Sequence, residues 1–267
     1  MESLNNIYFY HKKDTEMVAK AAPIYDLANR YGLTIVKDPQ KANIIASIGG
    51  DGAFLQAVRK TGFRDDCLYA GISTRNSLGI YCDFHINDLS KLIEALEYEQ
   101  LAVWNRPIIE VTVDDRSTFS CLNEFSIQSG IIKTLVIDVF IDNIHFETFR
   151  GDGLIVSTPT GSSGYNKSVN GAVVDPLLSC MQISELASVN SNQYRSLGSS
   201  FILGKERTLT LRVVPGNDHP TMGMDNEALS IRHVEKIQIK LSDKKIKTVK
   251  LKGNSNSFWE KVRKNFL

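Results

Sequence analysis

Three short stretches of this chain combine carboxylates, amides and hydroxyls with glycines in patterns that suit chemistry on a nucleotide. The first is the run Ser-Ile-Gly-Gly-Asp-Gly at 47–52, which follows an apolar segment and precedes a helical one. Glycines let a backbone turn sharply and approach a ligand closely, and the N–H groups at a helix start favour anions. Asp51 would repel a phosphate unless it faces a hydroxyl that must lose its proton, or a metal that bridges it to phosphate. Both roles belong to phosphoryl transfer; the alternative is a turn in which Asp51 caps the helix.

The second stretch is the pair Asn123-Glu124, inside the mostly apolar run 121–127. An amide beside a carboxylate is costly in a core unless both are hydrogen-bonded. The pair suits a nucleoside, because Asn offers a donor and an acceptor to an adenine edge and Glu accepts from ribose hydroxyls. The alternative is an exposed strand end.

The third stretch begins with Arg150-Gly151-Asp152-Gly153 and, after a predicted strand at 154–156, continues as a hydroxyl- and glycine-rich run at 157–168. Such loops place short donors and backbone N–H groups around a polar ligand. Tyr165 is suited to stack on a base or a nicotinamide, and Arg150 to meet a pyrophosphate. An ordinary surface loop is the alternative, but charged and aromatic residues interleaved with glycines are more than a linker requires. The sequence has no GxxxxGK[ST] loop and no GxGxxG after a strand, which disfavours P-loop kinases and dehydrogenases of the usual dinucleotide fold.

Composition narrows the class further. A formal net charge of +1 among 267 residues argues against a polyanion-binding surface. No apolar run is long enough to span a bilayer and the start does not resemble a secretory signal, so we expect a cytoplasmic protein with no membrane or nucleic-acid partner. The cysteines are scattered without CxxC pairs, which predicts buried thiols and no protein-bound metal: Cys67, Cys82, Cys121 and Cys180.

The elements that must position these stretches change in character along the chain. The first hundred residues alternate strand-like and helix-like segments, which predicts a mostly parallel sheet. The predicted strands are 7–10, 33–36, 44–48 and 68–72, and the predicted helices are 14–31 capped by Asp14, 54–60 and 88–96.

From residue 104 onward the pattern alternates at period two, which is typical of β-strands. We expect helix here only around 177–187, an exposed edge strand at the lysine-rich run 244–252, and a terminal helix that docks the stripe Phe258, Val262 and Phe266. The predicted fold is therefore α/β plus all-β. We expect an α/β domain at 1–103 that carries the GGDG turn, a β-rich ligand-binding domain at 104–250, a tail at 251–267, and the active site in the interdomain cleft.

The combination of these motifs resembles the NAD kinases. The residues that carry the resemblance are GGDG at 49–52, NE at 123–124 and GDG at 151–153 followed by TPTGS..Y, from about residue 44 to about 187. GGDG alone also occurs in diacylglycerol and sphingosine kinases and, loosely, in phosphofructokinases. The NE pair and the TPTGS..Y loop narrow the resemblance to NAD kinases, whose architecture is an α/β domain followed by a β-sandwich.

The resemblance implies that Asp51 accepts the proton of the ribose 2′-hydroxyl while ATP, with Mg²⁺ or another divalent cation, supplies the phosphoryl group. It implies that Asn123 and Glu124 hold the adenosine of NAD. It also implies that Arg150 and Asp152 line the dinucleotide cleft of the same or of a neighbouring subunit, because the enzymes of this family are commonly homo-oligomers (dimer or tetramer). The other residues it assigns to the site are Gly49, Gly50, Gly52, Thr160, Ser163, Gly164, Tyr165, Asn166, Lys167, Ser168 and Ala187.

Several positions depart from the family pattern. Ala53 stands where many members have Thr or Ser, Arg75-Asn76 where a glycine is expected, and Asp225-Asn226-Glu227 where DGQ is frequent. Ser163-Gly164 replaces the commoner Thr-Ala, and the segment 78–81 resembles the family's LGF without its phenylalanine. These changes bear on donor preference and binding strength more than on reaction type. The expected function is NAD kinase; the alternatives are a lipid kinase that shares the GGDG turn and a non-catalytic NAD sensor.

Overall fold

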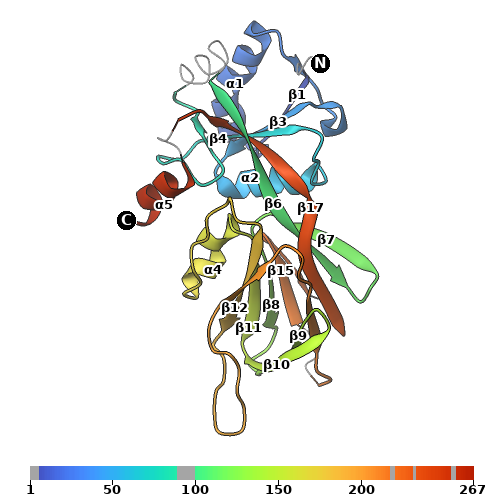
Figure 1. Ribbon diagram of the computed structural model, residues 1–267. Coiled ribbons are helices and arrows are strands. Elements are labelled where there is room, and N and C mark those ends of the chain that lie inside the picture. Colours follow the sequence, from blue (N-terminus) through green and yellow to red (C-terminus); the bar gives the residue numbers. More distant parts are fainter. Residues whose placement is uncertain (1–5, 89–99, 217–219, 231–232, 254–256) are drawn as a thin grey trace. The chain divides into compact units, whose positions relative to one another are not determined.

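The computed structural model describes residues 6–88, 100–216, 220–230, 233–253 and 257–267. The chain forms two compact units, one of residues 1–106 with 245–267 and one of residues 107–244. Figure 1 shows the first as helices around a sheet and the second as strands. The predicted fold class, α/β plus all-β, is confirmed.

Six strand segments in the sheet of the first unit pair in parallel. In spatial order it runs β2 (Thr34–Ile35), β1 (Asn6–Tyr10), β3 (Ile44–Gly49), β4 (Leu68–Ser73) and the last part of β17 (Lys236–Leu251), with the short β5 (Phe84–His85) beside the end of β4. A six-residue register between β3 and β4 aligns their carboxyl ends, from Ile44 opposite Leu68 to Gly49 opposite Ser73. Ligand sites of open α/β sheets lie at these ends.

Two helices cover opposite faces of this sheet because alternate strand residues point to opposite sides. Helix α1 (Thr15–Arg30), whose first turn Asp14 caps at 2.8 Å from the Met17 nitrogen as predicted, packs on the side of Ala46 and Ile48. Helix α2 (Asp51–Lys60) covers the other side, where Phe54 contacts Tyr69 and stacks on Tyr81. A short 3-10 turn, η1 (Pro39–Lys41), precedes β3.

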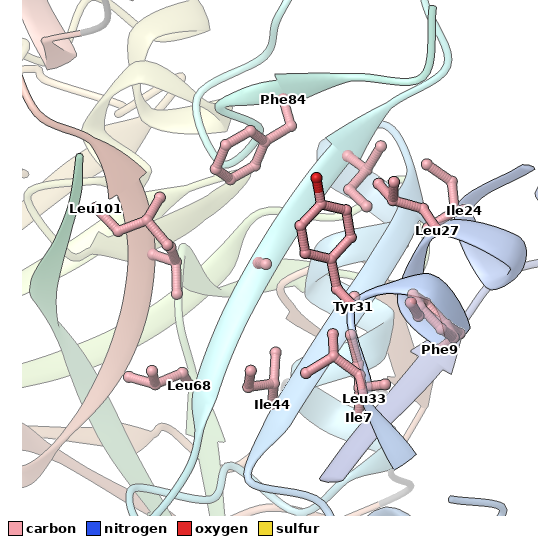
Figure 2. A pocket seen from close by; sticks show the side chains of 15 residues that line it. Ile7, Phe9, Ile24, Leu27, Tyr31, Leu33, Ile44, Leu68, Phe84 and Leu101 are labelled. Atoms are coloured by element: carbon pink, nitrogen blue, oxygen red, sulfur yellow. The ribbon is translucent and has the colours of Figure 1, made fainter. Parts of the chain in front are cut away.

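An apolar pocket of about 270 Å³ lies on the α1 side of this sheet. Figure 2 shows Ile24 and Leu27 of α1 facing side chains of the strands across it. Apart from Tyr31, its lining side chains have no hydrogen-bonding groups, so the pocket has little that could recognise a nucleotide.

The second unit is a β-sandwich. One layer is built from β10 (Ile144–Gly151), β9 (Leu135–Ile141), β14 (Leu209–Val213), the first part of β17, β6 (Leu101–Val113) and β7 (Ser117–Cys121). The other runs β13 (Phe201–Gly204), β12 (Cys180–Leu186), β11 (Gly153–Ser157), β8 (Glu124–Ser129), β15 (Pro220–Met224) and β16 (Glu227–Ser230). Side chains of both layers, such as Ile137 and Phe125, share one core.

The structure corrects three expectations for the β-rich part and the tail. The helix expected at 177–187 is strand β12, whose buried residues pair with β11 and β13. The lysine-rich run is no edge, because it pairs with β4 at Lys247 and Thr248 on one side and with β6 on the other. The tail does form helix α5 (Phe258–Phe266), but Phe266 is 42% exposed and Lys261 is buried in its place. The helix expected at 88–96 falls almost wholly outside the described residues.

Candidate active site

Asp51 is the first residue of helix α2, directly after the end of β3. Its carboxylate does not cap its own helix, as Gly50 is the N-cap residue. Instead, Oδ2 accepts from the backbone N–H of Ile80 at 2.8 Å and Oδ1 from that of Tyr81 at 2.9 Å. Each carboxylate oxygen can accept more than one hydrogen bond. The two N–H groups therefore orient Asp51 while leaving its oxygens able to take a hydroxyl proton.

Glycines allow this arrangement. A Cβ on Gly79 would lie 2.3 Å from the Asp51 Oδ1, so only glycine lets the loop approach the carboxylate. The guanidinium of Arg75 lies over Gly50, where an added Cβ would be 2.8 Å from its Nε. Gly52 is exposed with open space around its Cα, and Gly49 is buried at the end of β3. The three glycines of the predicted phosphate loop thus surround Asp51 in the chain, and one of them, Gly50, lies against the Arg75 guanidinium.

The Asn123-Glu124 pair lies at the start of β8 and is held from two sides. The Asp225 carboxylate accepts from the backbone N–H groups of Leu122, Asn123 and Glu124 at 3.0, 2.6 and 3.3 Å. On the other side, Thr158 donates from its nitrogen to the Asn123 carbonyl at 2.8 Å and from its hydroxyl to the Leu122 carbonyl at 2.7 Å. The backbone of the pair is therefore fixed by neighbours that are distant in sequence.

Glu124 is buried at 8% exposure, and its Oε2 has no hydrogen-bond partner among the described residues. Burial, with a smaller contribution from Asp225, raises its pKa to about 8, against the opposing hydrogen bond from the Tyr165 backbone. Ser157, opposite Glu124 in the β11–β8 register, also has a buried hydroxyl without a partner in the described part of the chain. Buried polar groups are seldom left unpaired, so a pair of them side by side indicates a ligand-binding position.

The hydroxyl-rich loop folds against this pair as the 3-10 turn η2 (Gly161–Ser163) and the short helix α4 (Tyr165–Ser168). A Cβ on Gly161 would meet the Asn123 carbonyl at 2.0 Å, and one on Gly164 would lie 3.1 Å from the Glu124 Oε2. The loop can approach the pair this closely only because both positions are glycines.

The predicted residues of this loop differ in what their side chains contact. Asn166 is buried and used internally: its amide donates to Ser162 and Ala172 at 3.3 Å, and its oxygen accepts from Ser184 at 2.6 Å. Ser163 is likewise buried and donates to the Thr160 carbonyl at 3.0 Å. The exposed predicted residues of the loop are Gly164, Tyr165, Lys167 and Ser168, and Thr160 is buried.

Arg150, Asp152 and Ala187 lie elsewhere. They flank the beginning of β11, where Gly153 pairs with Leu186, whereas Glu124 pairs with Ser157 at its end. Five residues of strand separate the two groups by about 16 Å, at about 3.3 Å per residue. The Arg150 guanidinium stacks on the Tyr194 ring at 4.3 Å. The structure thus brings Asn123, Glu124 and the 158–168 loop together but separates Arg150, Asp152 and Ala187 from them.

Comparison with known proteins agrees with these motifs. Residues 122–251 match the family model of the ATP-NAD kinase C-terminal domain. The chain is 63% identical over 263 residues to NAD kinase 2 of Bacillus subtilis (strain 168), covering 98% of each chain. It is 59% identical over 264 residues to NAD kinase 2 of Geobacillus kaustophilus, again covering 98% of each.

This chain belongs to the NAD kinase family. Two solved structures show the same NAD kinase fold at low identity. Yeast NADH kinase, complexed with NADH, has a TM-score of 0.79 at 17% identity and covers 98% of this chain and 87% of its own. An NAD kinase from Archaeoglobus fulgidus, in complex with ATP, has a TM-score of 0.76 at 22% identity and covers 97% of this chain and 98% of its own.

Two segments noted only as departures from the NAD kinase pattern have clear contacts in the structure. The segment 78–81 supplies the N–H groups that hold Asp51, and Asp225 supplies the carboxylate that holds Asn123 and Glu124. Sequence reasoning missed both functions, because each contact joins residues about 30 or 100 positions apart. The only signals in the sequence were Gly79 and Asp225, residue types that are common in turns and that do not by themselves indicate a distant partner.

Two negative observations concern the described residues. None of the helices described there is both long and apolar enough to cross a membrane. Over the same part of the chain, no group of three or more His, Cys, Asp or Glu side chains is placed to hold a metal ion. All four cysteines are free and buried, as the NAD kinase sequence predicted.

Proposed function

We propose that this chain is an NAD kinase that transfers the γ-phosphoryl group of ATP to the 2′-hydroxyl of the adenosine ribose of NAD, giving NADP and ADP. Relatives at 57–63% identity over the full chain, all named NAD kinase 2, support this proposal. The observation that carries it is Asp51: a carboxylate at the carboxyl end of a parallel strand, oriented by two backbone N–H groups.

Asp51 acts as the general base in this proposal. As the 2′-oxygen bonds to the γ-phosphorus and the bond to ADP breaks, the hydroxyl proton passes to the carboxylate. The Ile80 and Tyr81 N–H groups keep the carboxylate fixed, so little reorganisation is needed during the step. Arg75, which lies over Gly50 beside Asp51 in the chain, is suited to phosphate oxygens.

We propose that Asn123 and Glu124 hold the adenosine of the same NAD molecule. The Glu124 Oε2 and the Ser157 hydroxyl have no hydrogen-bond partner among the residues that the structure describes, so they are available to ribose hydroxyls or to the adenine edge. Tyr165, which is 38% exposed, offers a ring for stacking. Asn166 and Ser163 shape the loop from within, because their side chains are used in internal hydrogen bonds. An active site in the interdomain cleft stays a prediction, as do the domain boundaries expected from the sequence.

The position of Arg150, Asp152 and Ala187 favours a homo-oligomer, in which these residues contact NAD bound to a neighbouring subunit. They lie about 16 Å from the Glu124 end of β11, estimated at about 3.3 Å per strand residue, which is too far to contact the same ribose. Large apolar side chains on nearby strands support a second copy as partner: Ile144, Phe146 and Ile202 are 73%, 42% and 50% exposed. A cytoplasmic location also stays a prediction.

The divalent cation is proposed to arrive with ATP. Mg²⁺ keeps several waters and is usually held by one or two carboxylates plus the substrate phosphates rather than by an all-protein cage. Its chemistry is to neutralise charge on the transferred group. Asp51 and Arg75 act on the hydroxyl and the phosphates without requiring a resident metal.

The decisive experiment measures NADP from NAD, ATP and Mg²⁺ with an NADP-specific dehydrogenase. We expect turnover by the wild type, and a turnover lower by ~10²–10⁴ in Asp51→Asn with NAD binding retained. Unchanged turnover in Asp51→Asn would remove Asp51 as the base. An NAD-dependent rise in melting temperature without any NADP would instead identify a non-catalytic NAD sensor.

A further inference from the structure

The two N–H groups that hold Asp51 belong to a segment with no regular structure of its own. Residues 78–83 lie between the end of β4 and the short β5 and form no helix or strand. A loop without ladder hydrogen bonds keeps its N–H groups in one direction only when other contacts fix it. The position of Asp51 therefore depends on whatever holds this loop.

Helix α5 holds the loop by its carbonyl groups. Lys261 donates from Nζ to the carbonyls of Ile80 at 3.2 Å and Cys82 at 2.9 Å. Asn265, one turn further along α5, donates to the Leu78 carbonyl at 3.1 Å. Three alternate carbonyls of the loop are thus bound by one face of a helix from the end of the chain.

Arg106 adds a second support from strand β6. Its Nη2 donates to the Ile80 carbonyl at 3.3 Å and its Nε to the Thr248 hydroxyl at 3.1 Å. The guanidinium also lies over the Tyr81 ring at 4.9 Å. The peptide that donates to Asp51 is therefore fixed on its far side by two cations.

Lys261 is buried to an extent unusual for lysine, with its side chain 5% exposed and paired with Asp83 at 3.2 Å, itself 4% exposed. Burial lowers the pKa of Lys261, which the Asp83 carboxylate opposes, and burial raises the pKa of Asp83. A buried ion pair of this kind gives little net stability compared with apolar residues of similar volume. The contacts of Lys261 suggest a different use. Its ammonium donates to the carbonyls of Ile80 and Cys82, in the same loop whose N–H groups hold Asp51.

We propose that Lys261, with Asn265, is a positioning residue for phosphoryl transfer: it fixes the loop 78–83 so that the Ile80 and Tyr81 N–H groups orient the Asp51 carboxylate. The inference rests on the proposed role of Asp51 as the base. Helix α5 then contributes to catalysis indirectly, because its contacts are with the carbonyls of the loop 78–83 and the loop in turn holds Asp51.

The test compares Lys261→Met, Asn265→Ala and, as a matched control, Lys264→Met on the exposed side of α5. We expect kcat for NADP formation to fall ~10- to 100-fold in Lys261→Met and less in Asn265→Ala, with KM for NAD little changed. Lys261→Arg should recover part of the loss, and Lys264→Met should behave as wild type. If Lys261→Met does not fold, kcat is compared in Asn265→Ala and Lys261→Arg instead, and their melting temperatures show that both variants are folded.

Hydrogen exchange supplies a readout that a merely structural role would not give. In Lys261→Met the Ile80 and Tyr81 amides should lose protection while the amides of β3 and β4 keep theirs. Combining Lys261→Met with Asp51→Asn should lower kcat no further than Asp51→Asn alone. Wild-type kcat in both Lys261→Met and Asn265→Ala, uniform loss of protection, or fully additive losses would overturn the inference. The proposed function fails separately, if the wild type makes no NADP or Asp51→Asn keeps full turnover.

Discussion

The two carboxylates assigned to the site, Asp51 and Glu124, occupy similar places in the chain but different environments. Each lies at the end of a buried strand: Asp51 begins helix α2 just after β3, and Glu124 is the first residue of β8. Asp51 is partly exposed, and both of its oxygens accept from backbone N–H groups. Glu124 is buried, its Oε2 has no partner in the described part of the chain, and its pKa is raised to about 8.

This difference separates two tasks that one residue type can perform. A carboxylate oriented by two donors is suited to accept a proton at a defined point. A buried carboxyl with an unpaired oxygen is suited to bind a hydroxyl, because the ligand satisfies a group that is otherwise costly to bury. The residues that support each carboxylate differ as well. A glycine, Gly79, and two backbone N–H groups adjoin Asp51, whereas the carboxylate of Asp225 holds the backbone of Glu124.

The largest expected effect comes from Gly79→Ala, which disturbs the position of the Asp51 carboxylate. The new Cβ would lie 2.3 Å from the Asp51 Oδ1 and must displace the carboxylate. We expect kcat for NADP formation to fall about 10²-fold with little change in KM for NAD. Gly204→Ala, where a Cβ meets open space, is the matched control. A Gly79→Ala enzyme with wild-type kcat would contradict the placement of Asp51.

Asp225→Asn weakens the contacts that fix the backbone of Glu124, and it should alter the binding of NAD rather than the chemical step. The amide loses charge-assisted acceptance from three backbone N–H groups. At about 1–2 kcal/mol we expect KM for NAD to rise roughly 5- to 30-fold, with a smaller change in kcat. Asp114→Asn is the control, because Asp114 also accepts two backbone N–H groups, those of Glu235 and Lys236, but lies away from Glu124 in the sandwich. Equal effects on KM in both variants would argue against a specific role for Asp225.

The smallest effect concerns pH and stability. A carboxyl whose pKa is raised by folding favours the folded state while it is protonated, so its contribution is present below its ordinary pKa and lost as pH rises through about 8. The melting temperature of the wild type should therefore fall relative to that of Glu124→Gln between pH 5 and pH 9, by about 2–4 °C for each 1 kcal/mol. Calorimetry at matched ionic strength measures the difference. Parallel curves for the two proteins would show that Glu124 titrates near its ordinary pKa.

Much of this protein follows from its sequence by itself. The alternation of strands and helices in the first hundred residues and the period-two pattern after residue 104 predicted an α/β part and a β-rich part, because both patterns report which face of an element is buried. The GGDG turn, the NE pair and the TPTGS..Y loop predicted the family through their resemblance to the motifs of the NAD kinases. The Asp14 cap of helix α1 is a local feature, and the structure confirms it.

The tertiary structure decided what surrounds those motifs. Strand β12 was mistaken for a helix because a short apolar run does not distinguish the two, and only its pairing with β11 and β13 settles the matter. The lysine-rich run lies inside a sheet because its partners, β4 and β6, come from distant parts of the chain. The contacts that orient the site, from Ile80 to Asp51, from Asp225 to Asn123 and from Lys261 to Ile80, join residues 29 to 181 positions apart. Sequence periodicity reports local burial and carries no information on such distant pairs. Candidate site residues could therefore be proposed from the sequence, whereas the residues that hold them in place could not.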